Sequence, residues 1–356
     1  MQLVKSSVII LLMVLHILLA FSKFDNIQIL VEVILIIWFV NGLFKVKFQF
    51  QEIILIVVYL IAIGVSFLTN ELHVALLGGK VMGLGILSIL YFSKCKLDTR
   101  FLDIVFIINI FLIIYWYITG INITQSMADQ TGGSWANLSG RPLGLFMSAH
   151  ASAYFAAIYL IYYLHRSRFF GLGLFLIYTT TSLFTLIAYL SQILITFMSR
   201  YIVLFFYTVL LCIGVFVVML IFVSENSIEN MLEILLSPIS GIFAPDRIMG
   251  IGVIVFQMFN LEALSYVLTI FPNDYRSLLT TWVDDFGNEL MLFTYMQHAG
   301  LLLFVCYLWV LRSKSRYFFI FSLVGLFHYG DITTPLIVCM LVTYSTLIQN
   351  QEKNSD

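Results

Sequence analysis

The stretch Ser139-Gly-Arg-Pro-Leu-Gly-Leu-Phe-Met-Ser-Ala-His150 carries the chain from a polar loop into an apolar run that continues to residue 164. Arg141, Gly144 and His150 lie where that run begins, so a fixed charge, a flexible backbone position and a titratable ring meet at the expected boundary between water and lipid. Polar groups at such a boundary usually have a function. The same alternation of polar connection and long apolar run recurs along the chain and predicts its fold.

The composition is typical of a helical membrane protein. Of the 356 residues, 61% are hydrophobic and only 10% are charged. The apolar runs mostly measure about 18 to 22 residues, long enough to cross a bilayer as helices. We therefore expect an all-α, polytopic integral membrane protein that forms a single domain over 1–356. The net charge of -1 and the lack of a basic tract argue against a nucleic-acid partner.

Apolar segments in the sequence predict the membrane helices. The segments fall near 6–22, 27–44, 51–69, 74–93, 101–120, 143–164, 169–197, 201–223, 289–311, 317–330 and 332–349. Lysines and arginines concentrate in alternate short connections, which marks those connections as cytoplasmic by the positive-inside rule. These basic residues are Lys45 and Lys47, then Lys94, Lys96 and Arg100, then Arg166 and Arg168, and finally Arg312, Lys314 and Arg316.

Eleven spans cannot keep both the Lys5 terminus and the Arg312 connection inside while the long loop before residue 289 stays outside. We expect a twelfth crossing at 231–243, a short run broken by Pro238. The alternative is that 169–223 contains three short spans.

With twelve spans both termini are cytoplasmic, and two large segments lie on the outer side of the membrane, 120–142 and 245–288. Within the second, Ile248–Phe271 is apolar but interrupted by polar residues, so we expect a helix along the membrane surface. The tail after residue 349 is expected to be a frayed end.

The arginines outside the cytoplasmic connections are the most informative charges. A guanidinium offers planar paired donors that fit phosphate oxygens, and it stays charged in a pocket. A set of them at the outer membrane face suits an anionic lipid head group. Ordinary loop salt bridges with nearby aspartates and glutamates are the alternative. The arginines are Arg141, Arg200, Arg247 and Arg276.

Other candidates combine charge with an apolar setting. Lys80 lies a third of the way into its helix, where a charge is costly unless it is paired or reaches the interface, and it is a candidate substrate ligand. Gly78 and Gly79 beside it suit close helix packing. His150 could accept a proton or bind a sugar hydroxyl, and His328 between the last two segments could close a site. Each histidine could equally make only a local structural hydrogen bond.

Carboxylates precede the segment at 289–311. Asp284, Asp285 and Glu289 could bind sugar hydroxyls or take a proton from an acceptor. They could instead complement the dipole of the following helix. The sequence has no nucleotide-binding glycine loop and no metal-ligand spacing. We therefore expect neither a metal nor a cofactor.

Three pieces of the chain together resemble the O-antigen polymerase (Wzy) family, within the O-antigen polymerase and ligase superfamily. The first is Gly140-Arg-Pro-Leu-Gly-Leu-Phe146 before a helix with a polar Ser-Ala-His turn. The second is Leu190-Ser-Gln-Ile-Leu-Ile-Thr-Phe-Met-Ser-Arg200 before an apolar run. The third is Asp-Arg247, about forty residues before Asp284-Asp-Phe-Gly-Asn-Glu289 and its helix.

The resemblance implies a metal-independent glycosyltransferase of the bacterial inner membrane. It would join undecaprenyl-pyrophosphate-linked repeat units into O-antigen or capsular polysaccharide on the periplasmic face. A chain-length regulator would be a protein partner. The alternatives are an O-antigen ligase, or a flippase or transporter of lipid-linked oligosaccharide. Acids stand near 285–289 where ligases carry a histidine, which favours the polymerase.

The resemblance also assigns roles to individual residues. Arg200 and Arg247 match the substrate-binding arginines of the family and would act in catalysis, with Arg141 as a third contact. Asp285, Glu289 or His150 would assist the acceptor hydroxyl. The remaining substrate-binding candidates are Lys80, Arg276 and His328.

Overall fold

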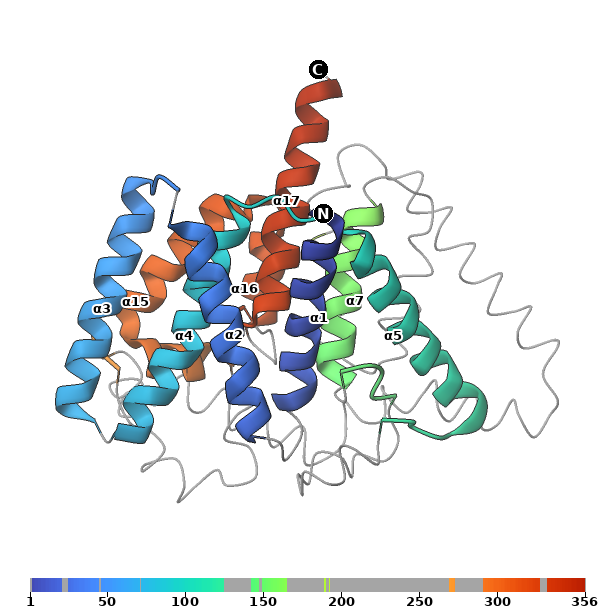
Figure 1. Cartoon of the computed structure of the whole chain (residues 1–356), viewed down its shortest axis with the longest axis horizontal. Helices are drawn as coiled ribbons and strands as arrows, with labels where there is room; N and C mark the ends of the chain where they lie inside the picture. The colour runs from blue at the N-terminus through green and yellow to red at the C-terminus, as the bar shows by residue number, and fades with distance from the viewer. Residues whose placement is uncertain are drawn as a thin grey trace. The chain divides into compact units, whose positions relative to one another are not determined.

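The computed structural model describes residues 2–20, 25–44, 46–70, 72–124, 142–146, 149–164, 189, 192, 269–272, 291–326 and 332–355. All regular structure within these residues is helical (Figure 1). The chain divides into two compact units, one formed by 1–103 with 254–356 and the other by 104–253. They are called unit 1 and unit 2 below. The single domain expected from the sequence stays a prediction.

The first four helices of unit 1 follow the predicted segments closely. Apolar runs set their lengths, and polar residues end them. The helices are α1 Gln2–Ala20, α2 Asp25–Leu43, α3 Phe50–Thr69 and α4 Leu72–Phe92. They pack as neighbours in the order α1, α2, α4, α3, so α4 lies between α2 and α3.

Two of these helices are long and apolar enough to cross a membrane, α2 over Asn26–Leu43 and α3 over Phe50–Thr69. Their outward faces consist of large exposed hydrophobic side chains, including Ile37 on α2 and Leu60 on α3. Such faces suit a hydrocarbon solvent rather than water. Helical structure and two potential membrane helices therefore agree with the class predicted from the sequence.

Close packing of α3 and α4 depends on glycine. The Tyr59 hydroxyl on α3 donates a hydrogen bond of 2.7 Å to the Gly79 carbonyl on α4. A Cβ at Gly83 would collide with that same hydroxyl, whereas a Cβ at Gly79 would meet only Ile63 at an ordinary distance. Close helix packing was one of two interpretations of Gly78 and Gly79. The Tyr59 contact is made at Gly79, and Gly83 is a further position with no room for a side chain.

Helix α15, Met291–Lys314, is interrupted at Gly300, where φ is 72° and ψ is 156°. The segment 269–272 lies against this break. The Thr269 carbonyl accepts a hydrogen bond of 2.8 Å from the Leu301 amide, and Asn70 at the end of α3 donates one of 3.0 Å to the Pro272 carbonyl. The expected surface helix over Ile248–Phe271 therefore does not extend to its last residues, which are not helical.

The last two predicted spans, 317–330 and 332–349, differ from each other in the structure. The described part of the first consists of short elements, and the second corresponds to a helix of 21 residues. Residues 316–318 form a 3-10 turn, and α16, Phe319–Gly325, has only seven residues, about 10 Å of helix. Helix α17 spans Pro335–Ser355. Just before its start, Thr333 lies beside Gly85 of α4. Gly85 is seven residues before the end of α4 at Phe92.

The Ser345 hydroxyl then accepts a hydrogen bond from the Tyr317 amide, so α17 returns to the level at which α16 begins. With 21 residues, α17 has the length of a full span, and only α16 is shorter than the span expected over 317–330 within the described residues.

The tail is not frayed, because α17 continues to Ser355 and extends past the neighbouring helices of unit 1 (Figure 1).

Unit 2 contains most of α5, Arg100–Thr119, and α7, Ala149–Leu164. The two helices run antiparallel, with the rings of Phe106 and Tyr159 stacked at a centroid distance of 4.0 Å. α7 begins six residues later than the expected start at 143, because a turn occupies 144–146. The predicted segments 201–223 and 231–243 lie outside the described residues, as do 169–197 except Tyr189 and Gln192 and most of the two large loops.

Candidate functional site

Residues 143–146, within the stretch Ser139–His150, form a turn held by two buried side chains. Oδ1 of Asn109 on α5 accepts a hydrogen bond of 2.9 Å from the Leu145 amide, and its Nδ2 donates one of 3.2 Å to the Ser152 carbonyl. The Ser152 hydroxyl donates to the Leu143 carbonyl at 2.7 Å. Both Asn109 and Ser152 are fully buried. The turn is therefore bonded to α5 and α7 at once.

Two residues just after α5 bind the same turn from the other direction. Oδ1 of Asn122 accepts a hydrogen bond of 3.0 Å from the Leu143 amide, and the Thr124 hydroxyl donates one of 3.0 Å to the Gly144 carbonyl. Gly144 has φ of 64°, a left-handed conformation that glycine adopts readily and that strains other residues. The turn thus depends on a glycine as well as on side-chain partners.

Most predicted site residues lie outside the described residues. His150 is the second residue of α7, so it follows the turn directly, as the sequence indicated. Lys80 is on α4 and is discussed next. The others, outside the described residues, are Arg141, Arg200, Arg247, Arg276, Asp285, Glu289 and His328.

Lys80 has a carboxylate partner within unit 1. Its Nζ lies 2.9 Å from Oε1 of Glu32 on α2. The same oxygen accepts from His16 Nε2 on α1 at 3.2 Å and from Gln28 at 3.0 Å. Glu32 is buried, while the Lys80 side chain keeps 38% of its surface exposed. Lys80 is therefore ion-paired between helices, and its role as a substrate ligand stays a prediction.

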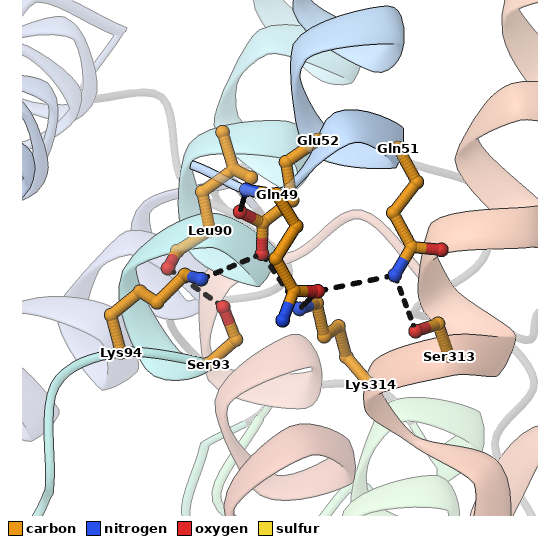
Figure 2. A network of polar contacts seen from close by, with 8 residues as sticks. All are labelled: Gln49, Gln51, Glu52, Leu90, Ser93, Lys94, Ser313 and Lys314. Carbon is orange, nitrogen blue, oxygen red and sulfur yellow. Dashed lines mark hydrogen bonds and ion pairs between the residues drawn. The ribbon is translucent and has the colours of Figure 1, made fainter. Parts of the chain in front are cut away.

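A second buried carboxylate joins three connections at one end of unit 1. Glu52, in the first turn of α3, is fully buried. Its Oε1 lies 3.1 Å from Lys94 Nζ after α4 and 2.6 Å from Lys314 Nζ at the end of α15 (Figure 2). Its Oε2 accepts a hydrogen bond of 2.7 Å from the Gln49 amide, which caps α3. We call this region, residues 46–49, 93–99 and 312–316, the lysine end.

Polar contacts around Glu52 extend this network. The Lys314 ammonium also donates to Oε1 of Gln49 at 2.8 Å, and Gln51 donates to the Ser313 hydroxyl at 2.9 Å (Figure 2). The Asp98 amide donates to the Ser6 hydroxyl at 3.0 Å, which brings the start of α1 to the lysine end. Three connections predicted to share one side of the membrane therefore do meet.

Sequence reasoning missed Glu32, Glu52 and His16 as members of polar clusters. The signal was present, because Glu32 and Glu52 are carboxylates inside or at the edge of apolar runs, where an ionisable group is costly without a partner. Their partners come from other helices, so the pairing was not readable from one segment. Within the described residues, no group of three histidines, cysteines or acids could hold a metal ion.

The sequence matches no family model. No curated protein and no solved structure is significantly similar to it. The function of the chain has to be inferred from its own residues.

Proposed function

We propose that the chain is a membrane-embedded, metal-independent glycosyltransferase that polymerises undecaprenyl-pyrophosphate-linked repeat units at the outer face of the bacterial inner membrane. The observation that carries the proposal is the distribution of cations. Lysines and arginines are mixed in the connections that meet at the lysine end of unit 1, whereas arginines dominate the segments that the sequence assigns to the other side. Those arginines are Arg141, Arg200, Arg247 and Arg276.

The contacts of Glu52 support the sorting of charges on which this proposal depends. They hold the ends of α4 and α15 and the start of α3 together, which agrees with a common cytoplasmic side for these connections. The twelve crossings expected from the sequence put both termini on that same side.

The chemistry follows from the charge of the leaving group. The acceptor hydroxyl oxygen forms a bond to the anomeric carbon of the growing glycan, while the bond from that carbon to the pyrophosphate oxygen breaks. Arg200 and Arg247 offset the negative charge that develops on the departing diphosphate. Asp285, Glu289 or His150 takes the proton of the acceptor hydroxyl. No metal is needed where guanidinium groups supply the positive charge.

The experiment is complementation of a polymerase-deficient strain with Arg200→Ala and Arg247→Ala, with protein levels measured in the membrane. We expect both variants to lose the polymer ladder and leave a core that bears one repeat unit. Arg200→Lys and Arg247→Lys should restore it only weakly, because lysine lacks the paired donors. Arg100→Ala, which removes an exposed arginine paired with Asp98 at the lysine end, is the matched control and should keep the ladder.

Normal ladders from both alanine variants at normal protein levels would overturn the proposal. The glycan pattern also separates the alternatives. Loss of a flippase leaves a core without any repeat unit, and loss of a ligase leaves polymer that is still attached to its lipid carrier.

A further inference from the structure

The network around Glu52 contains more positive than negative charge. The ammonium groups of Lys94 and Lys314 lie 3.1 Å and 2.6 Å from the same Glu52 oxygen, and their side chains are only 16% and 11% exposed. Within the part of the chain that the structure describes, no other carboxylate forms an ion pair with either lysine. One carboxylate therefore faces two largely buried ammonium groups, which leaves one positive charge in excess.

An excess charge in this position favours an anionic ligand. Water solvates a largely buried ammonium poorly, so a second negative charge close to the lysines would stabilise the network. Two ammonium groups that share one carboxylate oxygen also repel each other, and an additional anion reduces that repulsion.

The network is open to solvent on the side where α3 begins and α15 ends. Oε1 of Gln49 accepts hydrogen bonds from the Lys314 ammonium at 2.8 Å and from the Gln51 amide at 3.2 Å, and both contacts are exposed. Gln51 also donates to the Ser313 hydroxyl at 2.9 Å (Figure 2). A hydroxyl that accepts a hydrogen bond can donate its own hydrogen to an anion. An ammonium, an amide and a hydroxyl thus lie together at the surface.

Two exposed cations flank these donors. Arg312 precedes Ser313 on α15, and its guanidinium carbon lies 5.9 Å from the centre of the Phe319 ring. Lys47 is exposed two residues before Gln49. A guanidinium offers paired donors that match phosphate oxygens. The donor set therefore suits a phosphate group.

An apolar surface adjoins the polar group. Helices α3 and α15 are neighbours, and the Gln51 contact joins the start of the first to the end of the second. Away from that contact, their exposed side chains are large and hydrophobic. They are Phe50, Ile53 and Val57 on α3 and Leu302, Val305 and Trp309 on α15.

Trp309 lies three residues before Arg312, near the end of α15, where tryptophan favours the boundary between head groups and hydrocarbon. A ligand with both a phosphate and acyl chains matches this sequence of surfaces.

We infer that the junction of α3 and α15 at the lysine end binds a phospholipid with an anionic head group. Its phosphate lies beside Lys314 and Arg312, and its acyl chains lie along the exposed faces of the two helices. Basic clusters between membrane helices bind anionic head groups in this way. The inference goes beyond the proposed function and does not depend on it, because it concerns the leaflet at the lysine end and uses none of the residues assigned to the polymerase reaction.

Lipid titration of the purified full chain in detergent tests the site. The unfolding temperature is measured against added dioleoyl phosphatidylglycerol and, separately, against dioleoyl phosphatidylcholine. Phosphatidylglycerol should raise the unfolding temperature more, because a ligand that binds the folded state stabilises it. Native mass spectrometry should detect the bound phosphatidylglycerol directly.

Two substitutions at the site should weaken phosphatidylglycerol binding. Lys314→Met leaves Glu52 with Lys94 as its lysine partner, so the excess charge disappears, and the affinity should fall about tenfold, as for a lost hydrogen bond to a charged group. Arg312→Gln should weaken binding about fivefold, the usual effect of one cation at the membrane surface.

Two controls separate this site from general electrostatic attraction. Lys96→Met removes an exposed cation from the connection after α4, also at the lysine end, and it should leave the affinity unchanged. Glycerol 3-phosphate, which has the phosphate without acyl chains, should not raise the unfolding temperature at the same concentration.

Unchanged affinity in both Lys314→Met and Arg312→Gln would overturn the inference, as would an equal loss in Lys96→Met. Equal stabilisation by glycerol 3-phosphate would mean that the site binds a soluble anion, which also contradicts it. If Lys314→Met does not fold, Arg312→Gln decides, because its side chain is exposed. Polymer ladders test the proposed function separately from all of these outcomes.

Discussion

The Lys314 ammonium lies 2.6 Å from Oε1 of Glu52, so the end of α15 is tied to the first turn of α3. Lys94 approaches the same oxygen at 3.1 Å. Both lysine side chains are largely buried, at 16% exposed for Lys94 and 11% for Lys314. Their charges are therefore balanced mainly by Glu52 and not by water, which makes this carboxylate the centre of the lysine end.

Glu52→Ala should destabilise unit 1 strongly. Removing one member of a buried ion pair leaves the other charge without compensation, which typically costs about 3 to 5 kcal/mol, and we expect the lower end because the site lies at a helix end. Glu52→Gln keeps the shape and one acceptor and should cost less. The measurement is thermal unfolding of the purified protein in detergent.

The control for Glu52 is a carboxylate at the same end that is only partly buried and pairs with an exposed arginine. The Arg100 guanidinium holds the pKa of the Asp98 carboxyl below its usual value, by hydrogen bonds in which Nη2 lies 2.7 Å from Oδ2. Arg100 itself is well exposed, so solvent screens this pair. Asp98→Ala should leave the unfolding temperature unchanged, and a drop as large as that of Glu52→Ala would show that burial is not the deciding factor.

The ion pair between Glu32 and Lys80 leads to a second prediction, which distinguishes a role of Lys80 in stability from a role in activity. Lys80→Met should destabilise the protein because it leaves the Glu32 carboxylate buried with only His16 and Gln28 as partners. Lys80→Met combined with Glu32→Gln should recover stability, because no unpaired charge remains. Unfolding in detergent gives the stability, and polymer ladders give the activity.

Comparison of the two readouts decides what Lys80 does. If the double variant recovers both stability and ladders, Lys80 serves only the helix contact. If it recovers stability without ladders, Lys80 has a role with the substrate, as the sequence predicts.

The positions of the helices in unit 1 could be predicted because the length of each apolar run and the polar residues on either side of it determine them. The expected segment 51–69 is α3, Phe50–Thr69, and 27–44 is α2, Asp25–Leu43. An apolar run of that length between polar residues has one stable backbone conformation in lipid, the helix. No knowledge of neighbouring helices is needed for this part of the fold.

Breaks within apolar runs were not predictable in the same way. A hydropathy pattern reports only the polarity of local side chains. The breaks at Gly144 and Gly300 are instead stabilised by partners far away in the sequence. The Asn109 side chain binds the turn at Leu145, and the Thr269 carbonyl binds the Leu301 amide. The ion pairs of the lysines could not be predicted for the same reason, because Glu32 and Glu52 acquire their partners only when separate helices pack.

Gly300→Ala should be much more harmful than Gly120→Ala, although both glycines have similar φ, 72° and 69°. A Cβ at Gly300 would lie 2.6 Å from the Ile270 carbonyl oxygen, while a Cβ at Gly120 meets nothing within 4 Å. Gly120→Ala therefore reports backbone strain alone, on the order of 1 to 2 kcal/mol. Unfolding temperatures of the two variants measure the difference, and equal losses would mean that 269–272 does not press on the break.

The contact between Thr333, just before α17, and Gly85 of α4 predicts the accessibility of the start of α17. Thr334 precedes α17, close to Thr333 beside Gly85. In a chain without its natural cysteines, Thr334→Cys should resist an impermeant maleimide applied from the outer side. Leu72→Cys, exposed at the start of α4, should react from that side. Equal labelling of the two cysteines would place the start of α17 at the outer surface, as the two spans expected from the sequence require.

Labelling of Cys95 tests two features: the burial of its thiol, and the side of the membrane on which the lysine end lies. Burial raises the pKa of the Cys95 thiol. Since the thiolate is the reactive form, a raised pKa leaves less of it at neutral pH. In a chain whose other cysteines are replaced, Cys95 should react with maleimide more slowly at pH 7 than a cysteine placed by Lys96→Cys, where the native side chain is exposed.

The rate at Cys95 should rise more steeply than that of the Lys96→Cys control as the pH increases, because the thiolate population grows over a higher pH range. Both positions lie at the lysine end, so an impermeant maleimide should label them in inside-out vesicles and leave them unlabelled in intact spheroplasts. Labelling in spheroplasts would put the lysine end outside the cell. The arginines of the proposed site would then face the cytoplasm, away from the lipid-linked glycans that they are proposed to bind.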